Sequence, residues 1–265
     1  MLKDITLGQY FPGTSVVHRT DPRAKILIVT AYIVALFLAK GLWAYLLCGG
    51  VLVLAVAVAR ISPRLMIKGL RPILIIVIFT AVLNIFYTPG TVLWSWGFLR
   101  ITTEGLRNAA YMIARIILLI AATSLMTYTT SPIALTDGIE RLMNPLKKIK
   151  VPVHEFAMMM TIALRFIPTL IEETDKIMSA QKARGADFES GNLISRAKAL
   201  VPVLVPLFIS AFRRADELAT AMECRLYRGG DGRTRLHVLR YTALDAAAFA
   251  LTAAFVASVI LLRMV

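Results

Sequence analysis

The stretch AKILIVTAYIVALFLAKGLWAYLLCGGVLVLAVAVA (residues 24–59) contains two long apolar runs that are separated by little more than Lys40-Gly41. A helix that crosses a membrane needs about 20 consecutive, mostly apolar residues, and each run approaches that length. The short separation leaves room only for a tight turn. The stretch therefore predicts a hairpin of two short membrane helices and so a membrane protein.

The rest of the chain repeats this pattern. Of the 265 residues 58% are hydrophobic and only 17% are charged, and the mean hydropathy is +0.71, a balance typical of membrane proteins. Runs long enough to span occur at 24–40, 42–59, 72–88, 108–128 and 241–262. We expect an all-α polytopic membrane protein with about five transmembrane helices, together with amphipathic cytoplasmic helices.

Charge divides the chain into three segments. Residues 129–240 contain 17 of the 30 basic and 12 of the 16 acidic residues. We therefore predict a membrane region with four helices at 1–128, a cytoplasmic domain at 129–240 and a last transmembrane helix at 241–265. The positive charge of +14 follows the membrane topology and is not interleaved with aromatic residues, so we expect a lipid membrane and no nucleic acid as partner.

Basic residues also predict the orientation of the spans. The loop at 59–72 contains four basic residues and no acid, which favours the cytoplasmic side of the membrane. The N-terminus and residues 129–240 are then cytoplasmic as well, and the loop at 89–107, with Trp94 and Trp96, lies outside. Arg115 falls inside the fourth run, where it either extends to the outer membrane surface or marks a functional site.

Several local signals predict where helices begin. Asp21-Pro22 is a helix start before the first span. Ser131-Pro132 opens a short amphipathic helix near the inner leaflet, at about 133–149. Two longer segments follow at 154–185 and 200–230. In the first, Pro168 is expected to interrupt the helix; in the second, two prolines stand near its start.

In both long segments the predicted helix ends on an arginine. Steps of three and four residues give each helix one apolar face, and Arg184 and Arg225 extend that face instead of the charged one. A cation in the last turn followed by glycine is also ordinary helix capping. The repetition of the arrangement on two amphipathic helices favours a docking role.

The sequence contains no catalytic motif that we recognise. It lacks a phosphate-binding loop, HExxH, GxSxG, CxxC and paired intramembrane carboxylates. Asp245, at the start of the last span, is expected to be interfacial. The histidines His18, His154 and His237 are scattered, so each predicts a loop or helix-end residue and no metal site.

Several stretches together resemble the transmembrane T component of energy-coupling factor (ECF) type ABC vitamin importers. They are GQYFPGTSVVHRTDPRAK (8–25), TTSPIALTDGIERLMNPLKKIKVPVHE (129–155), IALRFIPTL (162–170), KARGADF (182–188) and AMECRLYRGG (221–230). The resemblance covers nearly the whole chain. It implies a non-catalytic subunit of the prokaryotic cell membrane that binds two ABC ATPase subunits and one substrate-binding S component. The chain itself would bind no cofactor, and the ATPases would bind ATP and Mg.

The resemblance also implies site residues. Two motifs with a central arginine would each dock on one ATPase: Ala183-Arg184-Gly185 and Cys224-Arg225-Leu226. The second departs from the Ala-Arg-Gly pattern at Leu226, and Gly229-Gly230 would then supply the helix exit. The S component would contact apolar residues of the cytoplasmic helices: Leu135, Ile139, Leu142, Met143, Leu146, Met158, Met159, Phe166, Leu204, Phe208 and Phe212.

Three other classes remain open from the residues alone. A secondary transporter would show repeated halves and broken intramembrane helices, and a membrane enzyme would need a convergent acid, base or nucleophile. A purely structural scaffold would differ from a coupling subunit only by not binding ATPases.

Overall fold

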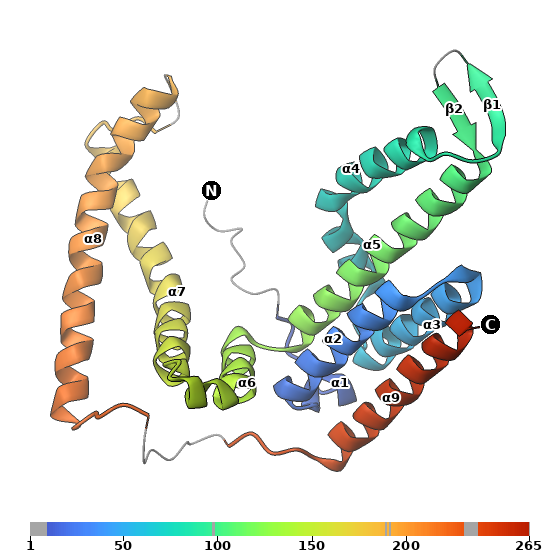
Figure 1. Ribbon diagram of the computed structural model, residues 1–265. Coiled ribbons are helices and arrows are strands. Elements are labelled where there is room, and N and C mark those ends of the chain that lie inside the picture. Colours follow the sequence, from blue (N-terminus) through green and yellow to red (C-terminus); the bar gives the residue numbers. More distant parts are fainter. Residues whose placement is uncertain (1–9, 97–98, 189, 191, 231–237, 265) are drawn as a thin grey trace. The chain divides into compact units, whose positions relative to one another are not determined.

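The computed structural model describes residues 10–96, 99–188, 190, 192–230 and 238–264. It is almost entirely helical (Figure 1). The first part of the chain forms α1 (Val16–Arg19), α2 (Pro22–Leu38), α3 (Gly41–Ala59), α4 (Pro63–Tyr87), β1 (Val92–Trp96), β2 (Leu99–Thr102) and α5 (Thr103–Thr129). The remainder forms α6 (Pro132–Met143), the 3₁₀ helix η2 (Asn144–Ile149), α7 (Val153–Ala183), α8 (Leu193–Cys224) and α9 (Ala243–Met264).

The described chain forms two compact units. The first, which we call the bundle unit, contains residues 10–138 and 238–264. The second, the hairpin unit, contains residues 139–230, with α7 and α8 as its long helices. The division of the sequence at 128/129 and 240/241 stays a prediction.

Five helices of the bundle unit correspond to the five predicted spans: α2, α3, α4, α5 and α9. By length and hydropathy alone, six of the described helices could cross a membrane, namely α3, α4, α5, α7, α8 and α9. Helix α2, with 17 residues, is shorter than the 18 residues of that criterion. The protein is thus an all-α polytopic membrane protein, as predicted.

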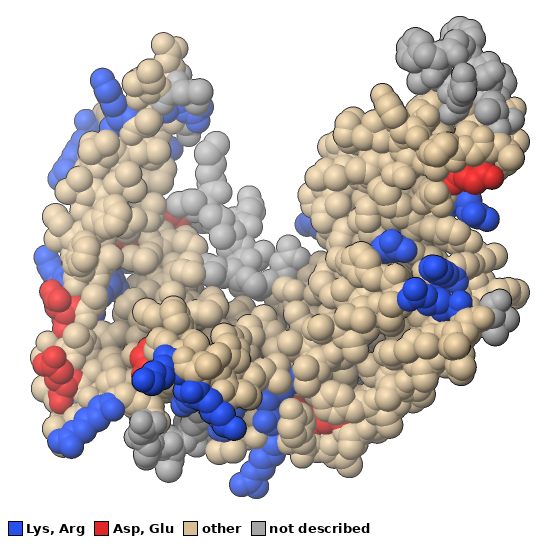
Figure 2. Space-filling view, in the orientation of Figure 1, with Lys and Arg blue, Asp and Glu red and all other residues tan. Residues whose placement is uncertain are grey.

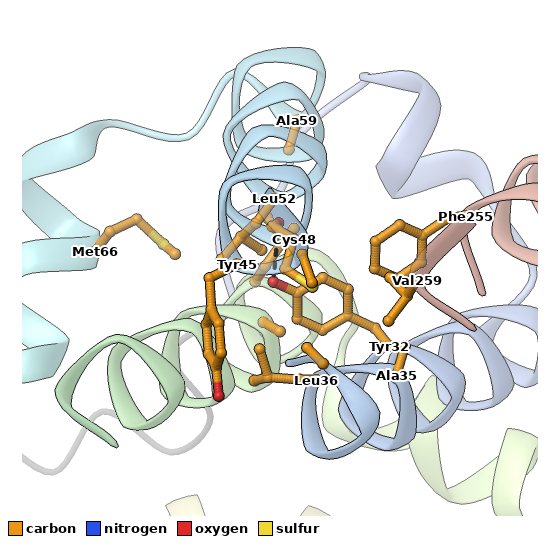
Figure 3. Packing of buried hydrophobic residues seen from close by; sticks show 14 of the residues in the cluster. Tyr32, Ala35, Leu36, Tyr45, Cys48, Leu52, Ala59, Met66, Phe255 and Val259 are labelled. Carbon is orange, nitrogen blue, oxygen red and sulfur yellow. Dashed lines mark hydrogen bonds between the residues drawn. The ribbon is translucent and has the colours of Figure 1, made fainter. Parts of the chain in front are cut away.

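The bundle core lies where α2, α3, α5 and α9 meet (Figure 3). Tyr32 of α2 stacks on Phe255 of α9 with ring centroids 5.6 Å apart. Its hydroxyl donates a hydrogen bond of 3.1 Å to the Cys48 carbonyl of α3. Small residues such as Ala35 and Ala44 are fully buried and let the helices approach closely. The predicted α2–α3 hairpin is therefore part of one packed bundle.

The helix starts follow the predicted signals. Asp21 is the N-cap of α2, and its carboxylate accepts a hydrogen bond from the Arg23 amide at 2.8 Å. Pro22 occupies the first helical position, where a missing N–H costs nothing. Helix α6 begins at Pro132, and the Ser131 hydroxyl accepts from the Ala134 amide at 3.3 Å.

Two predicted loops are wrong in part. The basic loop at 59–72 ends early, because α4 already begins at Pro63 and continues through Pro72. The loop at 89–107 contains the antiparallel hairpin of β1 and β2, followed by the first turn of α5. The Trp94 and Trp96 side chains, predicted at the membrane surface, lie outside the described residues.

The prolines of the hairpin unit do not break its helices. Helix α7 passes through Pro168 without interruption, contrary to the prediction, and α8 begins at Leu193, so that Pro202 and Pro206 lie inside it. A proline removes one backbone hydrogen bond, which long helices such as these can tolerate.

Candidate docking site: two arginine-ended helices

The end of α7 has a complete glycine cap. Arg184 is the C-cap residue, and Gly185 follows in the left-handed region with φ of 89°. The Gly185 amide donates to the Lys182 carbonyl at 3.0 Å, and the Ala186 amide donates to the Gln181 carbonyl at 3.0 Å. This pair of bonds is the Schellman arrangement, which satisfies carbonyls that the helix leaves open.

The end of α8 has the same backbone arrangement without glycine. Arg225 is the C-cap residue, and Leu226 takes the left-handed conformation with φ of 53°. The Leu226 amide donates to the Glu223 carbonyl at 2.8 Å, and the Tyr227 amide donates to Met222 at 3.0 Å. The Cys-Arg-Leu segment therefore repeats the backbone of Ala-Arg-Gly residue by residue. The prediction that Gly229-Gly230 supplies the helix exit is wrong.

Leu226 is an unusual residue for this position. A side chain in the left-handed region costs about 1–2 kcal/mol, and glycine or asparagine normally avoids the cost. The Leu226 side chain is also 75% exposed, so packing within the chain does not repay the strain. Ala183, Arg184, Gly185, Cys224 and Arg225 are exposed as well.

The two arginines lie at opposite ends of the hairpin unit. Helices α7 and α8 run antiparallel, so Arg184 lies beside the start of α8 and Arg225 beside the start of α7 (Figure 1). Met158, near the start of α7, lines a cavity together with Arg225. The 26 residues from Met158 to Arg184 correspond to about 40 Å along a helix. The arginines are thus two separate attachment points and do not form one site.

The cavity beside Arg225 has a volume of about 520 Å³. Met158 and Ile162 of α7 line one side, and Leu218 and Met222 of α8 line the other. Arg225 therefore lies at the end of an apolar groove, as the periodicity of α8 predicts. Such a groove can accept an apolar side chain beside a cation.

Polar contacts hold the two long helices together. Arg214 of α8 donates to the Glu173 carboxylate of α7 at 2.7 Å, and both side chains are partly exposed. Nearer the end of α7, the Gln181 amide donates to the Pro202 carbonyl at 3.5 Å. The sequence did not indicate the ion pair, because periodicity assigns Glu173 to the charged face.

Helix α8 has more apolar surface than the hairpin covers. Val203 is buried, whereas Leu204, Phe208 and Phe212, one turn apart from each other, are exposed by 46%, 61% and 69%. These three are the residues of α8 predicted to contact the S component. An exposed apolar helix face of this size contacts either a partner protein or lipid.

The other predicted S-component residues differ in exposure. Met143 and Met159 are exposed. The rest are half-buried, namely Leu135, Ile139, Leu142, Leu146, Met158 and Phe166. Within the hairpin unit, Glu140 at the end of α6 contacts the start of α7, where His154 Nδ1 lies 3.0 Å from Glu140 Oε1. His154 thus lies at a helix end as predicted, and so does His18; His237 lies outside the described residues.

The sequence did not predict the buried polar cluster at one end of the bundle unit. Asp245, predicted to be interfacial, is fully buried. It accepts hydrogen bonds from the Asp21 amide at 2.8 Å and from the Thr242 amide at 2.7 Å. Lys25 is 6% exposed and donates to the Thr129 carbonyl at 2.8 Å. The cluster joins the starts of α2 and α9 to the end of α5.

The Arg115 side chain contacts two aromatic residues of the bundle unit, Tyr45 and Phe37. Its Nε donates to the Tyr45 hydroxyl at 3.0 Å, and its guanidinium lies 5.5 Å from the centroid of Phe37.

Among the described residues, no group of three His, Cys, Asp or Glu side chains could hold a metal ion.

Long apolar helices and an exposed, arginine-ended hairpin define a multi-pass membrane protein with surfaces for partners. The family model CbiQ, cobalt transport protein, matches residues 13–236. The "energy-coupling factor transporter transmembrane protein EcfT" of Ruminiclostridium cellulolyticum is 57% identical over 265 residues, covering 100% of this chain and 99% of that protein. The proteins of the same name from Acidaminococcus fermentans and Bacillus subtilis are 57% and 50% identical, each over 246 residues, covering 93% and 92% of this chain and 92% and 93% of those proteins.

The chain therefore belongs to the family of transmembrane components of energy-coupling factor transporters. Such a component works in a membrane complex with partner subunits.

Proposed function

We propose that the chain is the coupling subunit of an ECF-type ABC importer. Each arginine-ended helix docks on one ABC ATPase, through Ala183-Arg184-Gly185 at α7 and Cys224-Arg225-Leu226 at α8. The observation that carries the proposal is the repeated helix end: two identical backbone caps present an exposed arginine at opposite ends of one hairpin. Arginine pairs well with carboxylates of a partner, and one helix end per ATPase suits a pair of ATPases.

The partners supply the chemistry in this proposal. The ATPases bind ATP and Mg, and the chain binds no cofactor and catalyses no reaction. The S component binds a vitamin or another micronutrient and docks on the exposed apolar face of α8 at Leu204, Phe208 and Phe212. When the ATPases close, they move the ends of α7 and α8, and the rigid helices transmit that motion to the S component. The N-terminus and residues 129–240 are cytoplasmic.

The direct test replaces both arginines. In the Arg184→Glu, Arg225→Glu variant, we expect loss of ATPase co-purification and of substrate uptake, because each change puts like charge opposite the partner's carboxylates. The matched control is Lys176→Glu, Lys198→Glu, which reverses two exposed charges on the same helices outside the two arginine motifs. Wild-type ATPase binding and uptake in the arginine variant would rule out the proposal and leave a scaffold that works without ATPases.

A second test uses the cysteines. Cys224 is exposed beside Arg225, and Cys48, the other cysteine of the chain, is buried. Maleimide should therefore label Cys224 in the isolated chain, and bound ATPases should protect it. Labelling at the same rate with and without ATPases would contradict docking at this helix end. A Cys224→Ser variant reports the background from Cys48.

A further inference from the structure

The bundle unit contains a cationic cavity that the coupling function does not use. It has a volume of about 670 Å³ and lies between the turn after α2, the end of α4 and the first half of α5. Lys40, Arg107 and Arg115 line it, and no acidic residue does. Figure 2 shows the Lys and Arg side chains that gather over α5 and the adjoining ends of α2 and α3. Within the described chain, none of the three cations has a carboxylate within 4.0 Å.

Arg115 is held in place but not neutralised. Its Nε donates a hydrogen bond to the Tyr45 hydroxyl. The Tyr45 ring stacks on Tyr111, with ring centroids 5.1 Å apart. The guanidinium carbon of Arg115 lies 5.5 Å from the centroid of the Phe37 ring. The described residues offer no hydrogen-bond acceptor to the two terminal nitrogens of Arg115. A cation that is fixed by neutral partners in a membrane helix is expensive unless an anion accompanies it.

The three cations lie toward the end of the bundle where α5 begins and where α2 turns into α3. Arg107, Tyr111 and Arg115 follow each other at steps of four residues and share one face of α5. Arg115 is about 12 Å further along the helix than Arg107, but its side chain leans back toward the start of α5. That end of α5 lies on the same side of the bundle as the α2–α3 turn, the side that charge asymmetry predicts to be outer.

We propose that this cavity binds the phosphate group of an anionic phospholipid. The terminal nitrogens of Arg115 and the side chains of Lys40 and Arg107 donate to the phosphate oxygens, as arginine and lysine commonly do. The acyl chains lie on the apolar surface of α4. That helix contributes Asn84 to the cavity and exposes Leu83 and, deeper along its length, Ile76 on the adjoining side. Inorganic phosphate would pair with the three cations only. A phospholipid would pair with them through its phosphate group and would also cover the apolar surface of α4 with its acyl chains.

The test measures lipid retention by the intact chain. Wild type is placed in nanodiscs of phosphatidylcholine alone or mixed with phosphatidylglycerol, and bound lipid is counted by native mass spectrometry. The Lys40→Gln, Arg107→Gln variant leaves Arg115 and its contacts intact, so folding is preserved; Arg115→Gln is the second variant. The matched control is Arg64→Gln, Lys68→Gln, which removes two exposed cations of α4 that do not line this cavity.

We expect wild type and the control to retain one phosphatidylglycerol, and the affinity of both cavity variants to fall roughly tenfold or more, the effect of losing one charge-assisted hydrogen bond. Added inorganic phosphate should not displace the lipid. Equal retention by wild type and the Lys40→Gln, Arg107→Gln variant would overturn the proposal, and so would equal affinity for both lipids. Displacement by inorganic phosphate would instead identify the ligand as free phosphate.

Discussion

Replacing Leu226 by glycine should separate the stability of the hairpin unit from its binding to the ATPase. Glycine at this position removes a strain of about 1 kcal/mol in the left-handed region, and the greater freedom of glycine in the unfolded chain offsets part of that gain. The free energy of unfolding should therefore stay unchanged or rise by up to about 1 kcal/mol. Binding should weaken, because the side chain is 75% exposed and is available to a partner.

The size of the binding effect follows from the exposed area. Complete burial of a leucine side chain stabilises by about 1.5–3 kcal/mol, so burying three quarters of it contributes about 1–2 kcal/mol. The Leu226→Gly variant should thus bind the ATPase roughly 5- to 30-fold more weakly. The assay is the dissociation constant of the detergent-solubilised chain and the purified ATPase, measured by biolayer interferometry, with thermal unfolding recorded in parallel.

The control is Leu226→Met, which keeps an apolar side chain in the same backbone position and should bind within about threefold of wild type. If Leu226→Gly binds as tightly as wild type, the leucine does not contact the ATPase and the proposed docking mode at α8 is refuted. If both stability and binding fall together, the left-handed exit at this residue is not strained as described.

Three further changes test other parts of the structure. Asp245→Asn should lower the free energy of unfolding by about 2–3 kcal/mol, measured by thermal unfolding in detergent, because a buried acceptor becomes a donor facing N–H groups. A double-mutant cycle with Glu173→Gln and Arg214→Gln should give a coupling of only about 0.5–1 kcal/mol, since the pair is partly exposed; a value near zero would mean that the pair does not stabilise the hairpin. Phe208→Glu with Phe212→Glu should abolish co-purification of the S component while ATPase binding stays unchanged, and loss of both would point to misfolding.

Features that depend on neighbouring residues were predicted well. The five spans of the bundle unit match the apolar runs, because each run is long enough to cross the membrane by itself. The start of α2 is set locally, by the capping carboxylate of Asp21 and by Pro22, whose ring fixes a helical φ angle at the first position. The end of α7 at Arg184-Gly185 could be predicted for the same reason, since glycine favours the left-handed exit without help from other residues.

Features that depend on distant residues could not be predicted. The buried Asp245 carboxylate accepts a hydrogen bond from the Asp21 amide, more than two hundred residues away along the chain, where α2 and α9 begin. Leu226 has no intrinsic preference for the left-handed region, so the sequence pointed to the glycines that follow it instead.

The sequence by itself determined an all-α membrane protein with two amphipathic helices ending on arginine, because hydropathy, helical period and caps are local properties. Only the tertiary structure decided which apolar residues of α8 pack against α7 and which stay exposed. It also decided that the two arginines lie far apart and that Arg115 shares a cavity with Lys40 and Arg107. Packing sets these relations, because the period of a helix gives the direction of a side chain but not the neighbour that it meets.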